Sequence, residues 1–330
     1  MFKTVDEAIH FIESQRAKRS FEDFQKIIER YQIPIDLKNV IHVAGTNGKG
    51  STVTFIKDLL MKQGYHVGTF TSPYIIKHHE RISVDGKPIS DDDLLRFINR
   101  LLPLIQQEHL SMFEIDTLIM LYYFNELDLD YHIIECGIGG LHDKTNVIKS
   151  NVAVITNIGY DHQFMLGDTL LEIAHHKVGI VKENVPLFTT EQNKEILSYF
   201  KDYCTKHQST FYPLQVEKQY QYPYHLHFHQ KEYVLHLPTY QVSNLTLALN
   251  VVDYLCDLND EDIQAVIDDF KWPCRFEQFG HLYLDGAHNI SGIEALIQTI
   301  KERKLEDVGI VFSALMDKDC QKMLDMLKEF

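Results

Sequence analysis

Short apolar runs alternate along this chain with stretches in which apolar residues recur every three or four positions. The recurring pattern predicts amphipathic helices, for example over Asp91–Gln107 and Met112–Glu126, and the short runs predict buried strands. The expected strands are Val40–Ala44, His66–Phe70, Tyr131–Cys136, Val152–Asn157 and Val185–Thr189. This alternation predicts an α/β fold with a doubly wound, mostly parallel sheet covered by helices on both faces. Ligands of such sheets bind beyond the carboxyl ends of the strands.

The pattern changes after residue 210. Over residues 211–237, Tyr and His alternate with apolar residues, which predicts a small antiparallel excursion. Later elements are expected as helices at Val242–Leu255 and Asp260–Asp269 and as strands at His281–Asp285 and Val308–Ser313. We place a domain boundary beside Lys271-Trp272-Pro273, giving domains 1–270 and 271–330. About 60 residues are few for a doubly wound domain, so we expect the second, smaller α/β domain to be partial, either truncated or naturally minimal.

A glycine-rich turn separates Val40–Ala44 from the next helical pattern. The turn and the start of the helix read Gly45, Thr46, Asn47, Gly48, Lys49, Gly50, Ser51 and Thr52. Glycines let backbone N–H groups turn toward an anion, and a helix N-terminus adds positive potential. Lys49 would reach the outer phosphates of a nucleotide, and Ser51 or Thr52 could hold Mg²⁺. Val43 stands where the standard P-loop has a glycine, so an ordinary glycine turn is the alternative interpretation.

Polar side chains follow the ends of three other predicted strands. Glu135 ends an apolar run beside this loop, where a Mg²⁺ ligand is expected, although a solvent-facing Glu is the alternative. His162 follows Val152–Asn157 and could join Glu135 at a second Mg²⁺, but alone it suggests a packed loop histidine. Ser72 follows the strand that ends at Phe70, as a ligand or a turn former.

Three further candidates are weaker by themselves. Lys177 stands in the segment Ala174–Ile180, and its alternative is an exposed helix lysine. The segment Asp285–Asn289 closes a strand of the second domain, with Arg275 ten residues earlier, and both would face the phosphate loop if the domains close over a cleft. His225, His227 and His229 lie on one face of a predicted strand, but no carboxylate or cysteine joins the set, so we prefer a solvated face to a metal site.

Composition excludes several classes of protein. The net charge of −15 over 330 residues argues against general nucleic-acid binding. Five scattered cysteines without a CxxC spacing indicate neither a disulfide framework nor a zinc site. The first ten residues do not have the pattern of a signal peptide, and no apolar run is long enough to span a membrane. We therefore expect a cytoplasmic protein.

Taken together, these segments resemble the folylpolyglutamate synthase/dihydrofolate synthase family of the Mur ligase superfamily. The order and spacing of many segments carry the resemblance, from about residue 20 to the end of the chain. They are His42–Thr52, Thr71–Pro73, Glu80–Ile82, Phe113–Glu114, Thr117, Glu135–Gly140, Asp143–Asn146, Asp161–His162, Leu166–Gly167, Lys177, Gly179–Ile180, Lys182, Arg275–Glu277, Asp285–Asn289 and Asp317–Asp319. The resemblance implies a Mur ligase-like ATP-binding domain over 1–270 and part of the C-terminal Mur ligase domain over 271–330.

The resemblance also implies roles at the phosphate loop. Lys49 and the loop around it would hold the ATP phosphates, and Ser51 and Glu135 would hold the Mg²⁺ that bridges them. Ser72, Glu135 and His162 would bind a second Mg²⁺. The family reaction is phosphoryl transfer from ATP to a carboxylate of folate or dihydropteroate, followed by attack of the L-glutamate amine on the acyl phosphate.

Other roles follow from matching positions. Lys177 matches a lysine that is carbamylated in many members, and Arg275, Asp285 and His288 would complete the nucleotide site. The pterin part of the substrate would lie near the loop Thr71–Arg81. The residues expected to act in catalysis are Lys49, Glu135, His162 and Lys177. We expect a monomer with small-molecule substrates and without nucleic-acid or membrane partners.

Some positions depart from the family pattern. His176 stands where an acidic residue usually precedes the lysine, Cys274 replaces a glycine, Ile290 replaces a proline, and Tyr240 replaces a histidine. The alternative is therefore a truncated or catalytically inactive relative that binds nucleotide or folate. A cell-wall amino-acid ligase of the same superfamily and a generic P-loop kinase or GTPase fit the motifs less well.

Overall fold

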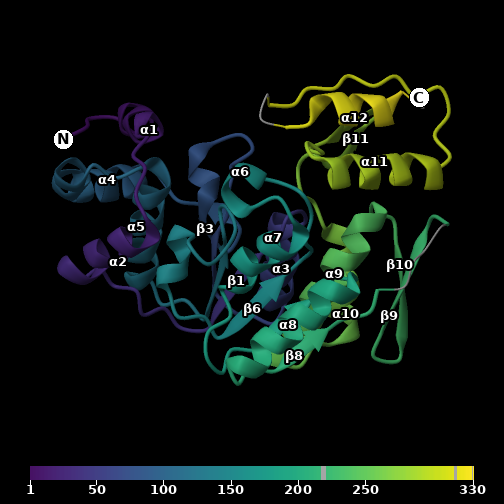
Figure 1. Ribbon diagram of the computed structural model, residues 1–330, viewed down its shortest axis with the longest axis horizontal. Coiled ribbons are helices and arrows are strands. Elements are labelled where there is room, and N and C mark those ends of the chain that lie inside the picture. Colours follow the sequence, from purple (N-terminus) through teal and green to yellow (C-terminus); the bar gives the residue numbers. More distant parts are fainter. Residues whose placement is uncertain (217–220, 316–317, 329) are drawn as a thin grey trace.

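A central eight-stranded sheet organises the computed structural model, which describes residues 1–216, 221–315, 318–328 and 330 (Figure 1). The strand order is β4-β3-β2-β5-β1-β6-β7-β8. The strands are β1 Val40–Ala44, β2 Val67–Phe70, β3 Ile82–Val84, β4 Lys87–Pro88, β5 Tyr131–Glu135, β6 Val152–Ile155, β7 Leu187–Thr189 and β8 Phe211–Pro213. Six neighbouring strands run parallel: β2, β5, β1, β6, β7 and β8. The strands β3 and β4 add an antiparallel edge beside β2. The predicted α/β fold with a mostly parallel sheet is confirmed.

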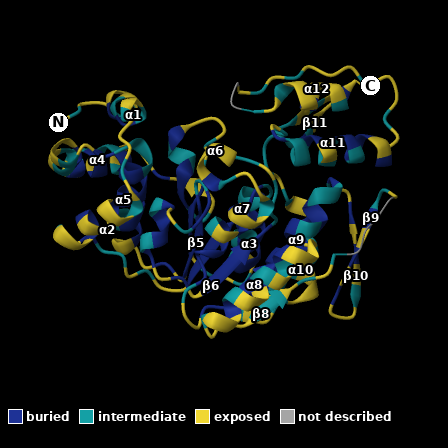
Figure 2. Cartoon of the chain, viewed as in Figure 1, coloured by how far each residue is buried: buried dark blue, intermediate teal, exposed yellow. Residues whose placement is uncertain are grey.

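Helices cover both faces of the sheet. They are α1 Val5–Ser14, α2 Phe21–Arg30, α3 Lys49–Lys62, α4 Asp91–Glu108, α5 Met112–Asn125, α6 Gln163–Leu166, α7 Leu170–Val178, α8 Lys194–Lys206, α9 Thr239–Leu255, α10 Asp260–Asp269, α11 Ile290–Glu302 and α12 Cys320–Leu327, with short 3₁₀ turns at His78–Arg81 and Lys144–Val147. Ile41 and Val43 of β1 pack with α3, α9 and α10, whereas Val40 and Ala44 pack on the opposite face. Figure 2 shows the resulting buried sheet between partly exposed helices. Burial on both faces explains why these strands are uninterrupted apolar runs.

The sequence located the main strands to within two residues. Val40–Ala44 was predicted with its observed bounds, and the predicted Val152–Asn157 ends at Ile155 in the structure. Over residues 211–237 the antiparallel prediction is confirmed by a hairpin of β9 Tyr224–Phe228 and β10 Lys231–Leu235. For the first part of that region the prediction was wrong, because β8 joins the main sheet in parallel with β7.

The last part of the chain forms a smaller layer beyond α9, drawn in yellow in Figure 1. It contains an antiparallel hairpin of β11 Arg275–Phe279 and β12 Leu282–Asp285, and α11 and α12 pack together through a small apolar cluster. The strand predicted at Val308–Ser313 was wrong, since this segment has no strand structure and Val311 is fully exposed. A strand needs a neighbour for its backbone hydrogen bonds, and β11 and β12 are paired with each other.

The β9–β10 hairpin region holds this last layer in place. The Arg303 guanidinium lies over the rings of Tyr222 (4.6 Å) and Phe276 (4.9 Å) and donates to the His236 carbonyl at 2.8 Å. The Tyr224 hydroxyl donates to Glu302 beside it. One arginine therefore joins three segments that are distant in sequence.

We expect Arg303→Ala to loosen this layer without unfolding the sheet. Amide hydrogen exchange should become faster in α11 and stay unchanged in β1, because Arg303 stabilises the C-terminal layer against the hairpin region. The exposed neighbour Lys304→Ala is the control and should leave α11 protected. Equal protection of α11 in both variants would show that Arg303 does not hold the layer.

Candidate active site

The loop between β1 and α3 has a backbone shape that only glycine adopts readily. Gly45 has a φ of 148° and Gly48 a φ of 84°. A Cβ atom on Gly45 would collide with the Thr156 side chain, and one on Gly48 would collide with Asn244. Gly48 also has no side chain to cap α3, so the first N–H groups of that helix remain available for an anion. The predicted glycine loop therefore leads directly into a helix, and its binding of phosphate stays a prediction.

Lys49 and Glu135 face each other at the mouth of this loop. The Lys49 Nζ donates to the carbonyls of Gly45 (3.1 Å) and Thr46 (3.3 Å) and lies 3.9 Å from Glu135 Oε1. The backbone N–H of Ser72 donates to Glu135 Oε2 at 3.2 Å. Desolvation raises the pKa of Glu135 to about 7, although Lys49 opposes the shift. The alternative of a solvent-facing Glu135 is wrong, because the side chain is buried.

The hydroxyls at the start of α3 are buried beside this pair. Ser51 accepts a hydrogen bond from Gln241 Nε2 at 3.1 Å, and Asn244 Nδ2 donates to Gln241 Oε1 at 2.8 Å. Thr52 Oγ1 is buried and has no hydrogen-bond partner among the described residues. Asn244 was not identified from the sequence, because it lies in the middle of a helix that is otherwise typical of a packed one.

Lys177 approaches the same loop from the other side. It is buried at the end of α7, and its Nζ donates to the Gly45 carbonyl at 2.8 Å. Desolvation, followed by the charge of Lys49, lowers the pKa of Lys177 to about 7. The alternative of an exposed helix lysine is therefore wrong. The structure brings two lysines to one carbonyl of the phosphate loop.

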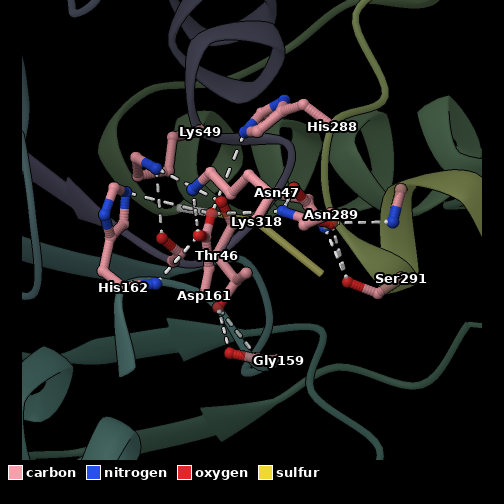
Figure 3. Close-up of polar contacts among 12 residues, drawn as sticks. Thr46, Asn47, Lys49, Gly159, Asp161, His162, His288, Asn289, Ser291 and Lys318 are labelled. Atoms are coloured by element: carbon pink, nitrogen blue, oxygen red, sulfur yellow. Dashed lines mark hydrogen bonds and ion pairs between the residues drawn. The ribbon is translucent and has the colours of Figure 1, made fainter. Parts of the chain in front are cut away.

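His162 and Asp161 lie beside the loop and meet the C-terminal layer (Figure 3). Lys318 Nζ contacts Asp161 Oδ1 at 2.5 Å, and His288 Nε2 lies 3.8 Å from Asp161 Oδ2. Burial alone would raise the pKa of Asp161, but Lys318 and His162 outweigh it and lower the pKa to about 2. Desolvation lowers the pKa of His162. Asp317, which belongs to a segment carrying the resemblance, lies outside the described residues.

Asn47 joins the phosphate loop to the start of α11 (Figure 3). Its Nδ2 donates to Asn289 Oδ1 at 3.1 Å and to Ser291 Oγ at 2.9 Å, and Asn289 Nδ2 donates back at 3.0 Å. Of the segment Asp285–Asn289, Asn289 contacts the loop at Asn47, whereas His288 lies near Asp161. Asp285 lies farther back, where Tyr240 donates to it at 2.8 Å.

Arg275 is placed between these groups. Its Nη1 donates to the Cys274 carbonyl at 2.8 Å, and its charge acts on both Glu135 and Asp285. The roles of Arg275, Asp285 and His288 toward a nucleotide stay predictions.

The loop after β2 is anchored by a buried network that the sequence did not indicate. His78 contacts Glu13 of α1 at 3.1 Å and Asp116 of α5 at 2.9 Å, and Arg81 Nε lies 3.5 Å from Asp116. Burial by itself lowers the pKa of His78, but the two carboxylates outweigh it and raise the pKa. The partners lie on helices far apart in sequence, so no local spacing could have revealed them.

A pocket of about 180 Å³ lies between α3, this loop and the segment before β11. Its lining includes Lys57, Thr71, Ile75, Ile76, Trp272 and Pro273. Ile76 is largely exposed at its rim. Trp272, which lines the pocket, also lies against the first turn of α3, since a Cβ atom placed on Gly50 would be 3.0 Å from Trp272 Cζ2.

The alternating histidines of β9 have a carboxylate partner that was not foreseen. Glu232 of β10 lies 3.2 Å from His225 and 3.4 Å from His227, while His229 pairs with Asp253. Within the part of the chain that the structure describes, no group of three or more His, Cys, Asp or Glu is placed to hold a metal ion. Across the same residues, no helix has both the length and the apolar character to cross a membrane.

Comparison with known proteins identifies the family. Residues 43–252 match the Mur ligase middle domain family. The dihydrofolate synthase/folylpolyglutamate synthase of Bacillus subtilis (strain 168) is 36% identical over 332 residues, which cover 92% of this chain and 77% of that protein.

Two solved structures have the same fold. An FPGS–AMPPCP–folate complex aligns with a TM-score of 0.85 and 27% identity, covering 99% of this chain and 87% of that one. A bifunctional folylpolyglutamate synthase/dihydrofolate synthase with Mn, AMPPNP and L-glutamate bound aligns with a TM-score of 0.84 and 27% identity, covering 99% and 82%. The chain therefore belongs to the folylpolyglutamate synthase/dihydrofolate synthase family of ATP-dependent Mur ligases.

Proposed function

We propose that this chain joins a carboxylate of folate or dihydropteroate to the amine of L-glutamate at the expense of ATP. The observation that carries the proposal is the placement of Lys49, Glu135 and Lys177 around one glycine loop at the carboxyl edge of the sheet. The substrate carboxylate attacks the γ-phosphorus, ADP leaves, and the acyl phosphate is then attacked by the glutamate amine with release of phosphate. In both steps the protein contributes positioning and charge neutralisation.

ATP would bind with its phosphates on the N–H groups at the start of α3. Lys49 now donates to two loop carbonyls, and its flexible stem lets the ammonium turn from them to the outer phosphates. The N-terminus of α3 favours the same negative charge. A solved relative holds AMPPCP and folate together, which supports this assignment.

The residues beside the loop fit Mg²⁺. Glu135 is a buried carboxylate and Ser51 a buried hydroxyl, and Thr52 Oγ1 has no hydrogen-bond partner among the described residues. These are oxygen ligands of the kind that Mg²⁺ prefers when phosphates and water complete its shell. Bound Mg²⁺ supplies neutralisation of phosphate charge. We assign Ser51 and Glu135 to one ion and Ser72, Glu135 and His162 to a second.

Lys177 suits carbamylation, because only a neutral amine attacks CO₂. The reaction forms an N–C bond, releases one proton and leaves a carboxylate at the end of the side chain. Burial favours the neutral amine at Lys177, with a pKa of about 7. The adjacent Gly45 carbonyl, 2.8 Å away, would accept the remaining N–H of the carbamate.

The acceptor substrate would lie in the pocket beside α3. One wall is the loop that carries Thr71, Ile75 and Ile76, and the apolar side chains suit a planar ring system. Lys57 supplies a positive charge for an anionic substrate. We further propose a monomeric cytoplasmic enzyme without nucleic-acid partners, in keeping with its net charge of −15.

Release of ADP by the purified chain tests the function. With MgATP, we expect ADP only when L-glutamate and either dihydropteroate or tetrahydrofolate are both present, and the preferred acceptor names the activity. Omitting either substrate is the control. Intact nucleotide binding without turnover on any acceptor would instead indicate an inactive relative.

Glu135→Gln should abolish ADP release and stabilise the unliganded fold at alkaline pH. The pKa of Glu135 is raised to about 7 from 4.5, so its ionisation costs stability as the pH rises through this window, up to about 3 kcal/mol above pH 7. The uncharged amide removes that cost. The measurement is urea unfolding of both proteins at pH 5 and pH 8 with ADP release alongside. Near-normal turnover in the variant would contradict the metal assignment, and a stability gain equal at both pH values would contradict the burial argument.

Carbamylation of Lys177 should be visible without any substrate. After addition of ¹³C-bicarbonate at pH 8, we expect a carbamate signal in the ¹³C NMR spectrum that declines as the pH falls below about 7, because the amine becomes protonated. Lys182→Gln, which changes a half-buried lysine nearby, should keep the signal, and Lys177→Gln should lose it. An identical signal in both variants would place the modification elsewhere.

A further inference from the structure

Trp272, the only tryptophan of the chain, lies in the turn between α10 and β11. Together with Pro273 it lines the pocket beside α3. The residue comes from the segment where the main body of the chain passes into the C-terminal layer. Trp272 therefore contacts the acceptor pocket and also lies at the junction between the main body and the C-terminal layer.

The same indole rests on the phosphate loop. A Cβ atom placed on Gly50 would lie 3.0 Å from Trp272 Cζ2, 3.5 Å from Trp272 Cε2 and 3.7 Å from Glu135 Oε2. The edge of the ring thus lies directly against the first turn of α3, on the side where Glu135 ends. The indole therefore lines the pocket and also borders the first turn of α3.

The indole N–H at this edge has no partner. Nε1 is buried from solvent and makes no hydrogen bond within the described residues. It is bonded to Cε2, one of the two atoms that approach Gly50, so the N–H belongs to the ring edge nearest the loop. A buried donor without an acceptor is unfavourable, so its persistence in a native protein calls for an explanation, such as a bound group that accepts the hydrogen bond.

We propose that Trp272 is a positioning residue for the acceptor, whose carboxylate receives the indole N–H and is held against the phosphate loop. An indole nitrogen donates only, so its partner is an oxygen acceptor such as a carboxylate, and the kinetic constants for each substrate show which carboxylate it is. The loop N–H groups and Lys49 are available to the phosphates of ATP. The carboxylate of an acceptor in the pocket needs a separate donor at the end of the pocket beside α3. The inference rests on the proposed function and adds the residue that aligns its acceptor.

Trp272→Phe tests the inference, because it keeps an aromatic wall and removes the N–H. We expect kcat/KM for the acceptor to fall about tenfold, as for a hydrogen bond to a charged group, and KM for ATP and for L-glutamate to stay within about twofold. Trp272→Leu should lower kcat/KM for the acceptor further. It should also permit ADP release without glutamate, since the aromatic wall that excludes water is removed.

Phe270→Leu is the matched control from the same segment. Phe270 stacks on Phe55 at 3.7 Å and is absent from the pocket lining, so this variant should lower Tm while the kinetic constants for the acceptor stay unchanged. Tm of Trp272→Phe should remain close to that of the unchanged chain.

Three kinetic outcomes would overturn the inference. Unchanged kcat/KM for the acceptor in Trp272→Phe shows that the N–H has no role in binding. A rise in KM for ATP alone assigns the donor to a phosphate. An equal decrease in kcat/KM for all three substrates, accompanied by the lowered Tm of the Phe270 control, shows a purely structural role.

Calorimetric binding separates this inference from the proposed function. If the unchanged chain binds tetrahydrofolate but does not turn over, the proposed function fails. A tenfold weaker binding by Trp272→Phe would then still support the role of Trp272, and equal binding would contradict it. If the unchanged chain binds neither tetrahydrofolate nor dihydropteroate, both proposals fail.

Discussion

The placement of a buried carboxylate opposite a lysine, Glu135 and Lys49, is the constraint on which the site depends. It arises because β1 and β5 are parallel neighbours, with Val43 opposite Glu135 in register. Both strands therefore finish at one edge, where β1 turns into the phosphate loop and β5 presents its carboxylate. An unpaired carboxylate at this depth would be costly, and its raised pKa shows that even beside Lys49 the charged form is not fully compensated. The site is thus electrostatically prepared for a cation and a polyanion together.

The other groups extend this arrangement across the chain. Lys177 reaches the loop from α7, and Asn47 ties it to Asn289 at the start of α11. Asp161 lies within ion-pair distance of Lys318 and His288, which belong to the C-terminal layer. The phosphate loop is therefore the point at which the sheet, its flanking helices and the last layer meet.

Local sequence patterns predicted correctly those features that depend on a single strand, loop or helix. The strand Val40–Ala44, the glycine loop and the carboxylate at Glu135 follow from periodicity and residue type, and the structure places them as expected. No local signal in the sequence indicated β8 in the main sheet or the contacts of His78 with Glu13 and Asp116, because these join distant segments. The strand predicted at Val308–Ser313 was wrong although a local signal was present. Its apolar pattern suits a strand, but a strand exists only with a partner, and none is specified locally.

Transfer of oxygen from the acceptor to phosphate tests the central claim most directly. In the proposed reaction, the acceptor carboxylate attacks ATP at the loop bounded by Lys49 and Glu135. The measurement is mass spectrometry of the phosphate released when the acceptor carboxylate is labelled with ¹⁸O. We predict one labelled oxygen in each phosphate released. Unlabelled phosphate, with amide product formed at the same rate, would contradict an acyl phosphate intermediate and with it the proposed role of the site.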